Sequence, residues 1–509
     1  MQPSNPASRR SAGTLCRIAL ALPLSLPLSL SSALSSALPF ALPFALPFAL
    51  VACVGRPPGG DAEPPPPAAP DPAQVALNDQ APPQPEPTSE DSADKAAGEP
   101  EPALPPLPDT YVAFATACGE ARLDATGDDP TAAAADEPPG ASEIARRSPG
   151  QRLGETITIA AIGDVLLHHE LQIQAFAADD RHRTLWRSIE DLLSAADITY
   201  ANLEGPMAAG IDKNGEDIGD PGEVFDKVVY TAYPRFNFHP SVAIDLKRSG
   251  VDVVSTANNH ALDRQAIGVD RTIDALKAAG LAFTGTRRSD ATDSAWHTVI
   301  RRKGLRIAFL ACTGLLNVRP DSGGQVLRCR GKDFERRVAS LAKSRKIDAV
   351  IVTPHWGKEY EPEPREREVE LAHRWAEAGA TAIIGSHPHV LQPWELYRTA
   401  DDREVMIHYS LGNFASHQPE LPKRSTILLY LGIGRDADGI TRVRGVRYLP
   451  LHVRQDGEEF FVESIDRVGG PADARALIVD MYGEANLLAP DDPLNVAPHC
   501  DPRWRPAAP

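Results

Sequence analysis

The chain has 509 residues, a formal net charge of −17 and 42% hydrophobic residues. This length is enough for a large buried core, and the hydrophobic content is that of a globular protein. Nucleic-acid binding requires a basic surface, so the acidic balance argues against it and we expect no nucleic-acid partner.

The first 52 residues have the features of a lipoprotein signal peptide. Arginines near the start are followed by a long apolar stretch that ends in "LVAC" at Cys53. In a bacterial lipobox, the cysteine at this place is lipidated and becomes the first residue. We therefore expect an exported protein anchored through Cys53, and Val54 favours the outer membrane, facing the periplasm. The alternative is an uncleaved anchor, which leaves the cysteine unexplained; the repeated "ALPF" prolines oppose a membrane-spanning helix.

The composition divides the rest of the chain. Residues 53–106 are rich in Pro, Ala and acidic residues, which predicts a disordered linker. Residues 107–155 are expected to be partly ordered. The globular domain is expected at 156–455, followed by a C-terminal extension at 456–509.

Four cysteines remain beyond the signal segment and Cys53, an even number that is typical of an oxidising compartment. We expect two disulfides, Cys312 with Cys329, which closes a short loop, and Cys118 with Cys500. The alternative is four free thiols. The chain contains no C-x-x-C pair, so a zinc ribbon or thioredoxin-like centre is not indicated.

From Thr156 onward, predicted strands alternate with predicted helices. In chain order, the strands rich in β-branched residues are 156–164, 198–206, 251–260, 348–357 and 381–389. The segments with apolar residues at helical spacing are 185–197, 241–250, 268–280, 334–346 and 365–380. A hairpin is predicted at 297–312. Strands at 404–414, 425–434 and 440–454 follow one another without helices. The alternation predicts an α/β fold, and the late run of strands suggests a second sheet, giving a two-sheet sandwich covered by helices.

Polar side chains end five of the predicted strands. They are Asp164, with His168 four residues later; Asn202 and Glu204; Asn258, Asn259 and His260, with Asp263 beyond; His355; and His387 with His389. In α/β folds, ligands bind at the carboxyl ends of strands, so we expect these groups at one edge of a sheet. Singly, each has a structural explanation as a cap, a turn or a packed loop residue. Five such ends together favour a site.

The mixture of carboxylate, imidazole and amide groups suits Mn²⁺, Zn²⁺ or iron. The number of candidate ligands is enough for two ions that share one carboxylate, which is a layout of metal-dependent hydrolases. We therefore predict two divalent metal ions as cofactors.

Six motifs in chain order, from Thr156 to Phe414, carry a resemblance to a known family. They are "GDVLLH", "NLEGP", "ANNHALD", "HWGKEY", "GSHPHVLQPWE" and "SLGNF". They resemble the bacterial CapA family of poly-γ-glutamate capsule proteins, which is related to calcineurin-like metallophosphoesterases. The resemblance implies a metallophosphoesterase-like αββα fold, in which two packed sheets are flanked by helices.

The resemblance also implies roles for the strand-end residues. Asp164 and His389 would bind the first ion, Glu204 would bridge, and Asn259, His355 and His387 would bind the second. His260 would be the acid that protonates a leaving group. The phosphoesterase D-x-H motif is absent, because Leu166 stands where the histidine would be. His168 is the candidate replacement.

Two arginines and two asparagines are candidates for substrate contacts. Arg365 and Arg367 follow His355 and could contact an anionic polymer, although a solvated helix start with alternating charges is the more common explanation. Asn202 and Asn258 are the others.

Two functional hypotheses follow. The first is a metal-dependent hydrolase or transferase acting in synthesis, processing or export of poly-γ-glutamate capsule or a related anionic polymer. The alternative is a non-catalytic accessory lipoprotein that binds this polymer or its export machinery.

Overall fold

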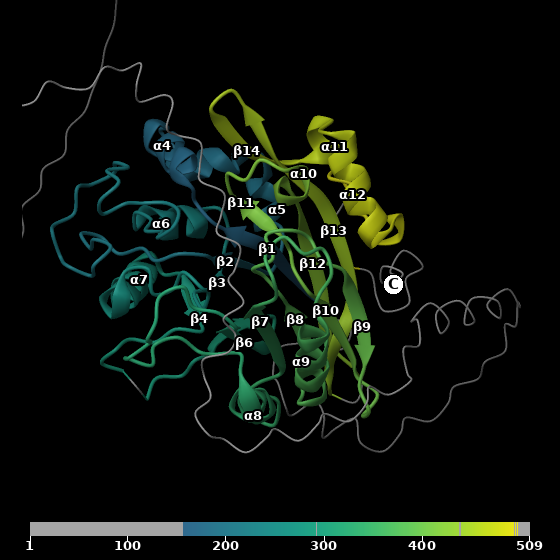
Figure 1. Cartoon of the computed structure of the whole chain (residues 1–509). Coiled ribbons are helices and arrows are strands. Elements are labelled where there is room, and N and C mark those ends of the chain that lie inside the picture. The colour runs from purple at the N-terminus through teal and green to yellow at the C-terminus, as the bar shows by residue number, and fades with distance from the viewer. Residues whose placement is uncertain (1–155, 292, 437–438, 493, 495, 497–509) are drawn as a thin grey trace, which may run out of the picture. The chain divides into compact units, whose positions relative to one another are not determined.

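The structure is a computed structural model that describes residues 156–291, 293–436, 439–492, 494 and 496 (Figure 1). The predicted signal peptide, the lipid on Cys53, the linker and the Cys118–Cys500 pair lie outside the described residues. No helix in the described part of the chain is both long enough and apolar enough to cross a membrane.

An eight-stranded sheet contains both the first and the last strands of the described chain (Figure 1). Its order is β14-β13-β12-β1-β2-β3-β4, and β11 also pairs with β1. The bounds are β1 Thr156–Val165, β2 Ile198–Leu203, β3 Val253–Ser255, β4 Ala282–Thr284, β11 Asn413–Ala415, β12 Ser425–Arg435, β13 Thr441–Asp456 and β14 Glu459–Ser464. Strands β1 to β4 are parallel, so their carboxyl ends meet at one edge.

A six-stranded sheet contains the middle of the chain in the order β5-β6-β7-β8-β10-β9. The bounds are β5 Thr298–Arg302, β6 Leu305–Thr313, β7 Ala349–His355, β8 Ala382–Ile384, β9 Trp394–Arg398 and β10 Glu404–His408. Strands β6, β7, β8 and β10 are parallel. The predicted hairpin is β5–β6, which turns at Lys303 and Gly304, both with positive φ.

Helices connect and cover these strands. They are α4 His169–Ala177, α5 Glu190–Ser194, α6 Ser241–Arg248, α7 Gln265–Ala279, α8 Gly331–Ala342, α9 Glu366–Glu377, α10 Leu421–Arg424, α11 Ile465–Val468 and α12 Ala472–Tyr482. Single turns of 3₁₀-helix are η1 Arg181–Leu185, η2 Arg187–Ile189 and η3 Glu484–Asn486.

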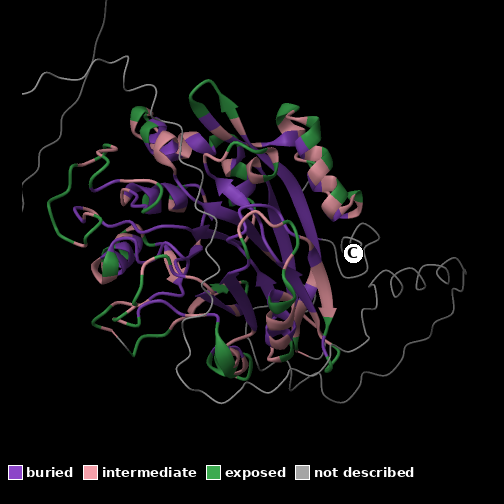
Figure 2. Cartoon of the chain, in the orientation of Figure 1, coloured by how far each residue is buried: buried purple, intermediate pink, exposed green. Residues whose placement is uncertain are grey.

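In the described part of the chain, buried apolar side chains pack between the sheets and on the outer face of each sheet. Between the sheets lie residues such as Ile159, Phe309 and Leu429, and the strands there are buried on both faces (Figure 2). On the outer face of the larger sheet, Leu246 of α6 belongs to a second cluster. On the outer face of the smaller sheet, Trp375 of α9 belongs to a third. The predicted α/β class and the two-sheet sandwich flanked by helices are confirmed.

Two expectations about elements are corrected. The late strands form the second sheet only in part: β10 joins the smaller sheet, whereas β12, β13 and β14 join the larger one. Strand β12 pairs antiparallel with β1, and almost every residue of β12 is buried. A strand that is buried on both faces must lie inside a sheet. Strand β12 does so because it pairs with the edge of β1 that β2 leaves open and with β13 on its other side. The predicted helix at 185–197 is only α5 with short 3₁₀ turns, because Trp186 and Ile189 leave the helical conformation. The Trp186 side chain turns into the core and donates to Ser249 Oγ (2.8 Å).

The sheet continues beyond residue 455, the expected end of the domain. Strand β14 pairs with β13 through residues 459–464. Helix α12 packs on β12 and β13, and its Ile478 and Tyr482 are buried in the core between the sheets.

Candidate metal centre

The polar strand ends gather where the carboxyl edges of both sheets face each other. Asp164, Asn202, Glu204 and Asn259 come from the larger sheet. His355 follows β7, and His387 and His389 follow β8, both in the smaller sheet. The sequence predicted one sheet edge; the structure uses two, because the sandwich places these edges side by side. All seven residues are buried.

Glu204 lies at the centre of this cluster. Its side chain is fully buried, and neither carboxylate oxygen has a hydrogen-bond partner within the described residues. Oε1 lies 3.4 Å from His355 Nε2 and 3.8 Å from His389 Nε2. Burial opposes ionisation, but the imidazoles of His389 and His355 outweigh it and hold the pKa of the Glu204 carboxyl below its ordinary value. The centre therefore contains a buried, ionised carboxylate.

Three candidate ligand sets lie in this cluster, and two of them include Glu204. The sets are Asp164, Glu204 and His389; Glu204, His355 and His387; and Glu359, His387 and His389. Within each set the ligand atoms lie within 4.8 Å of one another. Glu204 is common to the first two sets.

Asp164 and His389 form one side of the centre. Asp164 Oδ2 lies 3.2 Å from His389 Nδ1, and Asn202 Nδ2 donates to Asp164 Oδ1 (2.8 Å). Burial, together with the Glu204 charge, raises the pKa of the Asp164 carboxyl. Burial lowers the pKa of His389, but the carboxylates of Glu204 and Asp164 outweigh it and raise the value to about 10.

His355, His387 and Asn259 form the other side. His355 Nε2 lies 2.9 Å from Asn259 Oδ1 and 3.1 Å from His387 Nδ1. His355 Nδ1 is 3.1 Å from Ser386 Oγ, which orients the ring. Burial, with the neighbouring His355, lowers the pKa of His387 well below its ordinary value. A neutral imidazole with a free lone pair is the form that binds a metal.

The turn that carries the histidine pair has an unusual backbone. His387 has φ 103° and His389 has φ 58°, in the left-handed region that non-glycine residues rarely adopt. Such conformations persist where the surroundings impose them, and they concentrate at functional sites. Pro388 lies between the two and restricts the turn further.

His260 lies beside the centre and is oriented by an acid. Its Nδ1 is 2.7 Å from Asp263 Oδ2, and its ring packs edge-on against Phe236. Burial lowers the pKa of His260, but Asp263, with a further contribution from Glu204, raises it above the ordinary value. The arrangement is that of an imidazole held by a carboxylate so that Nε2 can carry a proton.

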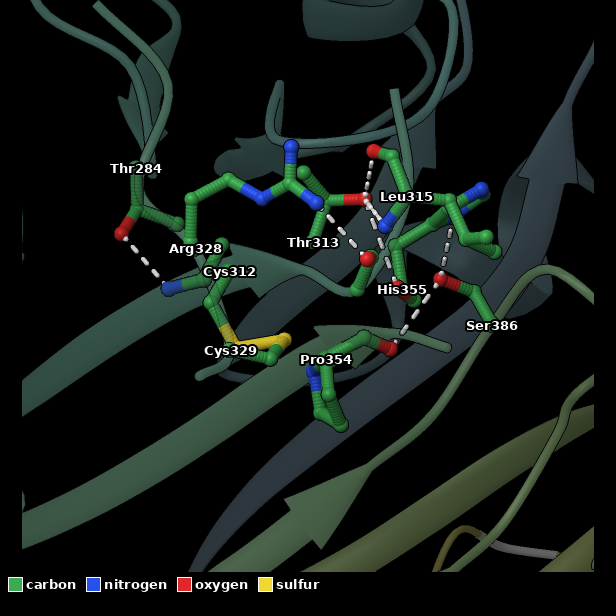
Figure 3. The surroundings of a disulfide bond; sticks show 11 residues. Thr284, Cys312, Thr313, Leu315, Arg328, Cys329, Pro354, His355 and Ser386 are labelled. Carbon is green, nitrogen blue, oxygen red and sulfur yellow. Dashed lines mark hydrogen bonds between the residues drawn. A yellow bond between two sulfur atoms is a disulfide. The ribbon is translucent and has the colours of Figure 1, made fainter. Parts of the chain in front are cut away.

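The Cys312–Cys329 disulfide expected from the sequence is present beside the centre. It joins the end of β6 to Cys329, near Thr313 and His355 (Figure 3). The loop that it closes contains Asn317. The backbone N–H of Asn317 donates to Asn259 O (2.9 Å), and its Nδ2 lies 3.5 Å from His260 Nε2.

Other predicted site residues occupy different places. His168 belongs to none of the ligand sets found among the described residues. Arg365 caps α9, and its guanidinium binds Glu368 and the Gly357 carbonyl. Arg367 is exposed on α9. Asn258 donates to Leu203 O (2.7 Å), while its Oδ1 is buried without a partner in the described structure.

Three residues near the centre had no assigned role in the sequence. Asn413 Oδ1 lies 2.9 Å from His389 Nδ1, Ser386 contacts His355, and Glu359 belongs to the third ligand set. All three fall inside or beside the motifs "SLGNF", "GSHPH" and "HWGKEY". The motifs were a signal for them, but only the fold shows what each side chain contacts.

The fold and the site define an α/β two-sheet protein with a buried carboxylate, imidazole and amide cluster. A family model described as "Bacterial capsule synthesis protein PGA_cap" matches residues 158–418, about half of the chain. The chain belongs to this family, which confirms the resemblance carried by the six motifs.

Curated relatives agree with this family assignment. The chain is 26% identical over 328 residues to "Capsule biosynthesis protein CapA" of Bacillus anthracis, covering 62% of this chain and 72% of that one. It is 26% identical over 308 residues to "PGA biosynthesis protein CapA" of Bacillus subtilis (strain 168), covering 59% and 75%. It is 27% identical over 334 residues to a "Probable polyglutamine synthesis accessory protein" of Mycobacterium tuberculosis, covering 60% and 78%.

Solved structures are only distantly similar. The NAD nucleotidase of Haemophilus influenzae matches with a TM-score of 0.37 at 12% identity, covering 66% of this chain and 57% of that one. The 5'-nucleotidase of Candida albicans matches with a TM-score of 0.30 at 10% identity, covering 59% and 52%. The chain thus spans little more than half of each structure, and similarity at this level supports no conclusion about activity.

Proposed function

We propose that this chain is a lipid-anchored protein of the cell envelope that binds two divalent metal ions and acts on poly-γ-glutamate capsule or a related anionic polymer. The proposed action is metal-dependent hydrolysis or transfer during synthesis, processing or export of the polymer. Family membership supports the capsule process. The metal centre is supported by the chemistry of the buried cluster.

One observation carries the metal proposal. Glu204 is fully buried, yet both of its carboxylate oxygens lack a hydrogen-bond partner among the described residues. A buried carboxylate without donors is costly unless a cation compensates it. Asn202 Oδ1 and Asn258 Oδ1 are likewise buried without partners there. Oxygen atoms left free around imidazoles are the donors that Mn²⁺, Zn²⁺ or iron require, so the residues present fit the ions.

In this proposal, each ion has its own ligands. Asp164 and His389 would hold the first ion, and His355, His387 and Asn259 the second. Glu204 would bridge them. When bound, the two ions would acidify a water and stabilise negative charge developing on the substrate.

The protein itself would supply the proton for the leaving group. Asp263 holds His260 Nδ1 at 2.7 Å and favours the protonated ring. His260 would then donate through Nε2, the atom near Asn317 Nδ2 (3.5 Å). The Cys312–Cys329 loop, which carries Asn317, would keep this geometry fixed.

A second candidate is a non-catalytic accessory protein that binds the polymer. Leu166 favours it, because this buried core residue stands where phosphoesterases place a histidine ligand. His168 also favours it, because this residue belongs to none of the candidate ligand sets among the described residues. It is also consistent with the name of the Mycobacterium tuberculosis relative, which describes an accessory protein.

The test compares the full-length protein with His260→Gln and with the control His297→Gln. Metal content and cleavage of poly-γ-glutamate and of a phosphoester are measured for each. We expect bound divalent metal in all three. Polymer cleavage should fall by roughly 10²–10⁴-fold in His260→Gln only, because a positioned acid contributes about this much. Polymer binding without cleavage by the wild type would establish the accessory function. Absence of bound metal would refute the metal centre.

A further inference from the structure

We propose that Glu359 is a ligand of the first ion, completing the set of Asp164, Glu204 and His389. This inference rests on the proposed two-ion centre. It replaces His168, the candidate that the sequence suggested, with a carboxylate from a different loop. It also makes the two ion positions chemically different.

The Glu359 carboxylate is placed beside the histidine pair and is otherwise unoccupied. One of its oxygens lies within 4.8 Å of a ring nitrogen of His387 and of His389. The carboxylate makes no hydrogen bond or ion pair with any described residue. Its neighbour Lys358 pairs with Glu361 instead (2.7 Å). A half-buried carboxylate beside two imidazoles would ordinarily form a hydrogen bond with one of them. The separation between the Glu359 oxygen and the ring nitrogens instead suits an ion bound between them.

The backbone holds Glu359 in this position. The Tyr360 N–H donates to Pro388 O at 2.7 Å, which ties the loop after β7 to the turn between the two histidines. Tyr360 has φ 67° and Gly357 has φ 96°. A Cβ on Gly357 would lie 3.3 Å from Pro388 Cγ, so the two turns are in close contact. Two unusual backbone conformations therefore direct Glu359 toward the centre.

The number of available ligands assigns Glu359 to the first ion. The second position has Glu204, His355 and His387, with Asn259 Oδ1 2.9 Å from His355 Nε2. Each imidazole normally gives one nitrogen to one ion, and His387 is used there.

The first position has only three ligands without Glu359. His168 belongs to no candidate ligand set among the described residues. Its Nδ1 lies 3.1 Å from Leu166 O and 3.2 Å from the backbone nitrogen of His417. Glu359 is the further carboxylate that shares a candidate ligand set with His389, and we assign it as the fourth ligand.

The consequence is a difference in metal preference. With Glu359, the first position has three carboxylates and one imidazole, a hard donor set that suits Mn²⁺ better than Zn²⁺. The second position has two imidazoles, one amide oxygen and the shared carboxylate, a softer set that accepts Zn²⁺ or iron.

The experiment is a calorimetric titration of MnCl₂ into the full-length protein after metal removal. The variants are Glu359→Gln and Glu359→Asp, with Glu363→Gln as the matched control, because Glu363 is an exposed glutamate of the same loop. His168→Ala tests the rival ligand, and Asp164→Asn marks the loss of the first ion. Thermal unfolding of each metal-free protein checks folding.

We expect two Mn²⁺ ions per chain in the wild type, Glu363→Gln and His168→Ala. In Glu359→Gln, as in Asp164→Asn, one of the two should bind at least about 10-fold more weakly, and Glu359→Asp should recover part of the loss. In competition, Zn²⁺ should displace Mn²⁺ more readily from Glu359→Gln. Wild-type affinities at both positions in Glu359→Gln, or loss of an ion in His168→Ala, would overturn the assignment of Glu359. A wild type that binds no Mn²⁺ or Zn²⁺ would instead refute the metal centre itself.

Discussion

The charged groups at the two ends of strand β7 differ in whether they have hydrogen-bond partners. At the amino end, Asp348 is fully paired: it accepts from the backbone N–H and Nε of Arg306 (both 2.8 Å) and from Arg435 Nη2 (2.7 Å). At the carboxyl end, His355 faces Glu204, whose oxygens have no hydrogen-bond partner in the described structure. The Asp348 carboxylate is thus paired by arginines of the chain, whereas the Glu204 carboxylate has no hydrogen-bond donor among the described residues.

The amino end also shows that a cavity lined by charge is not in itself a site. A cavity of about 680 Å³ lies there, lined by Arg306, Asp348, Arg403 and neighbouring residues. Arg403 binds Asp401 and the carbonyls of Ala376 and Ala380. These cations hold the β-strand ends and adjacent turns together. Pairing, rather than the number of charges, distinguishes a structural cluster from a binding cluster.

The largest effect that would test this comparison is expected from Glu204→Gln. The substitution keeps the shape but removes the charge that would bridge both ions. We expect affinity for Mn²⁺ at both positions to fall by at least about 100-fold, measured by calorimetry, with polymer cleavage lost. The metal-free protein should unfold within a few degrees of the wild type. Retention of two tightly bound ions would mean that Glu204 is not a shared ligand.

Asp348→Asn should lower the stability of the protein and leave its metal affinity unchanged, the reverse of Glu204→Gln. It leaves Arg306 and Arg435 without their shared carboxylate in a largely buried place. Removing one partner of a buried pair costs about 3–5 kcal/mol, and partial exposure of Arg306 reduces this to roughly 2–3 kcal/mol of unfolding free energy. Denaturant unfolding measures the loss, and metal affinity should not change. A loss of metal binding with unaltered stability would contradict the structural role.

An effect confined to acidic pH should come from His408, which is buried and lies away from the ligand sets. Neither ring nitrogen has a partner within the described residues, and the ring packs on Trp394 and Tyr482. Burial lowers the pKa of His408 to about 3. Between about pH 6.5 and 3 the unfolded chain therefore binds more protons than the folded one, so stability falls as the pH decreases through this window.

The variant His408→Phe should remove this dependence. We expect the unfolding free energy of the wild type to fall relative to the variant by about 1.4 kcal/mol per pH unit below about pH 6.5, with little difference above it. Denaturant unfolding at several pH values measures this. Parallel losses in the two proteins would show that His408 is not the group that titrates.

The sequence by itself determined the local elements and the strand ends. The alternation of strands and helices, the hairpin at Lys303 and Gly304 and the residues that follow each strand are properties of neighbouring residues, so they could be predicted. For the same reason, Asp164, Glu204, His355, His387 and His389 could be selected as a group.

The tertiary structure decided which sheet each strand joins and where each side chain points. Strand β12 returns to β1, and β11 places Asn413 opposite Asp164, within reach of His389. His168, four residues after Asp164, has its Nδ1 beside backbone groups, whereas Glu359, four residues after His355, lies beside His387 and His389. Strand pairing over hundreds of residues and side-chain direction depend on packing in the whole core, which no local pattern contains.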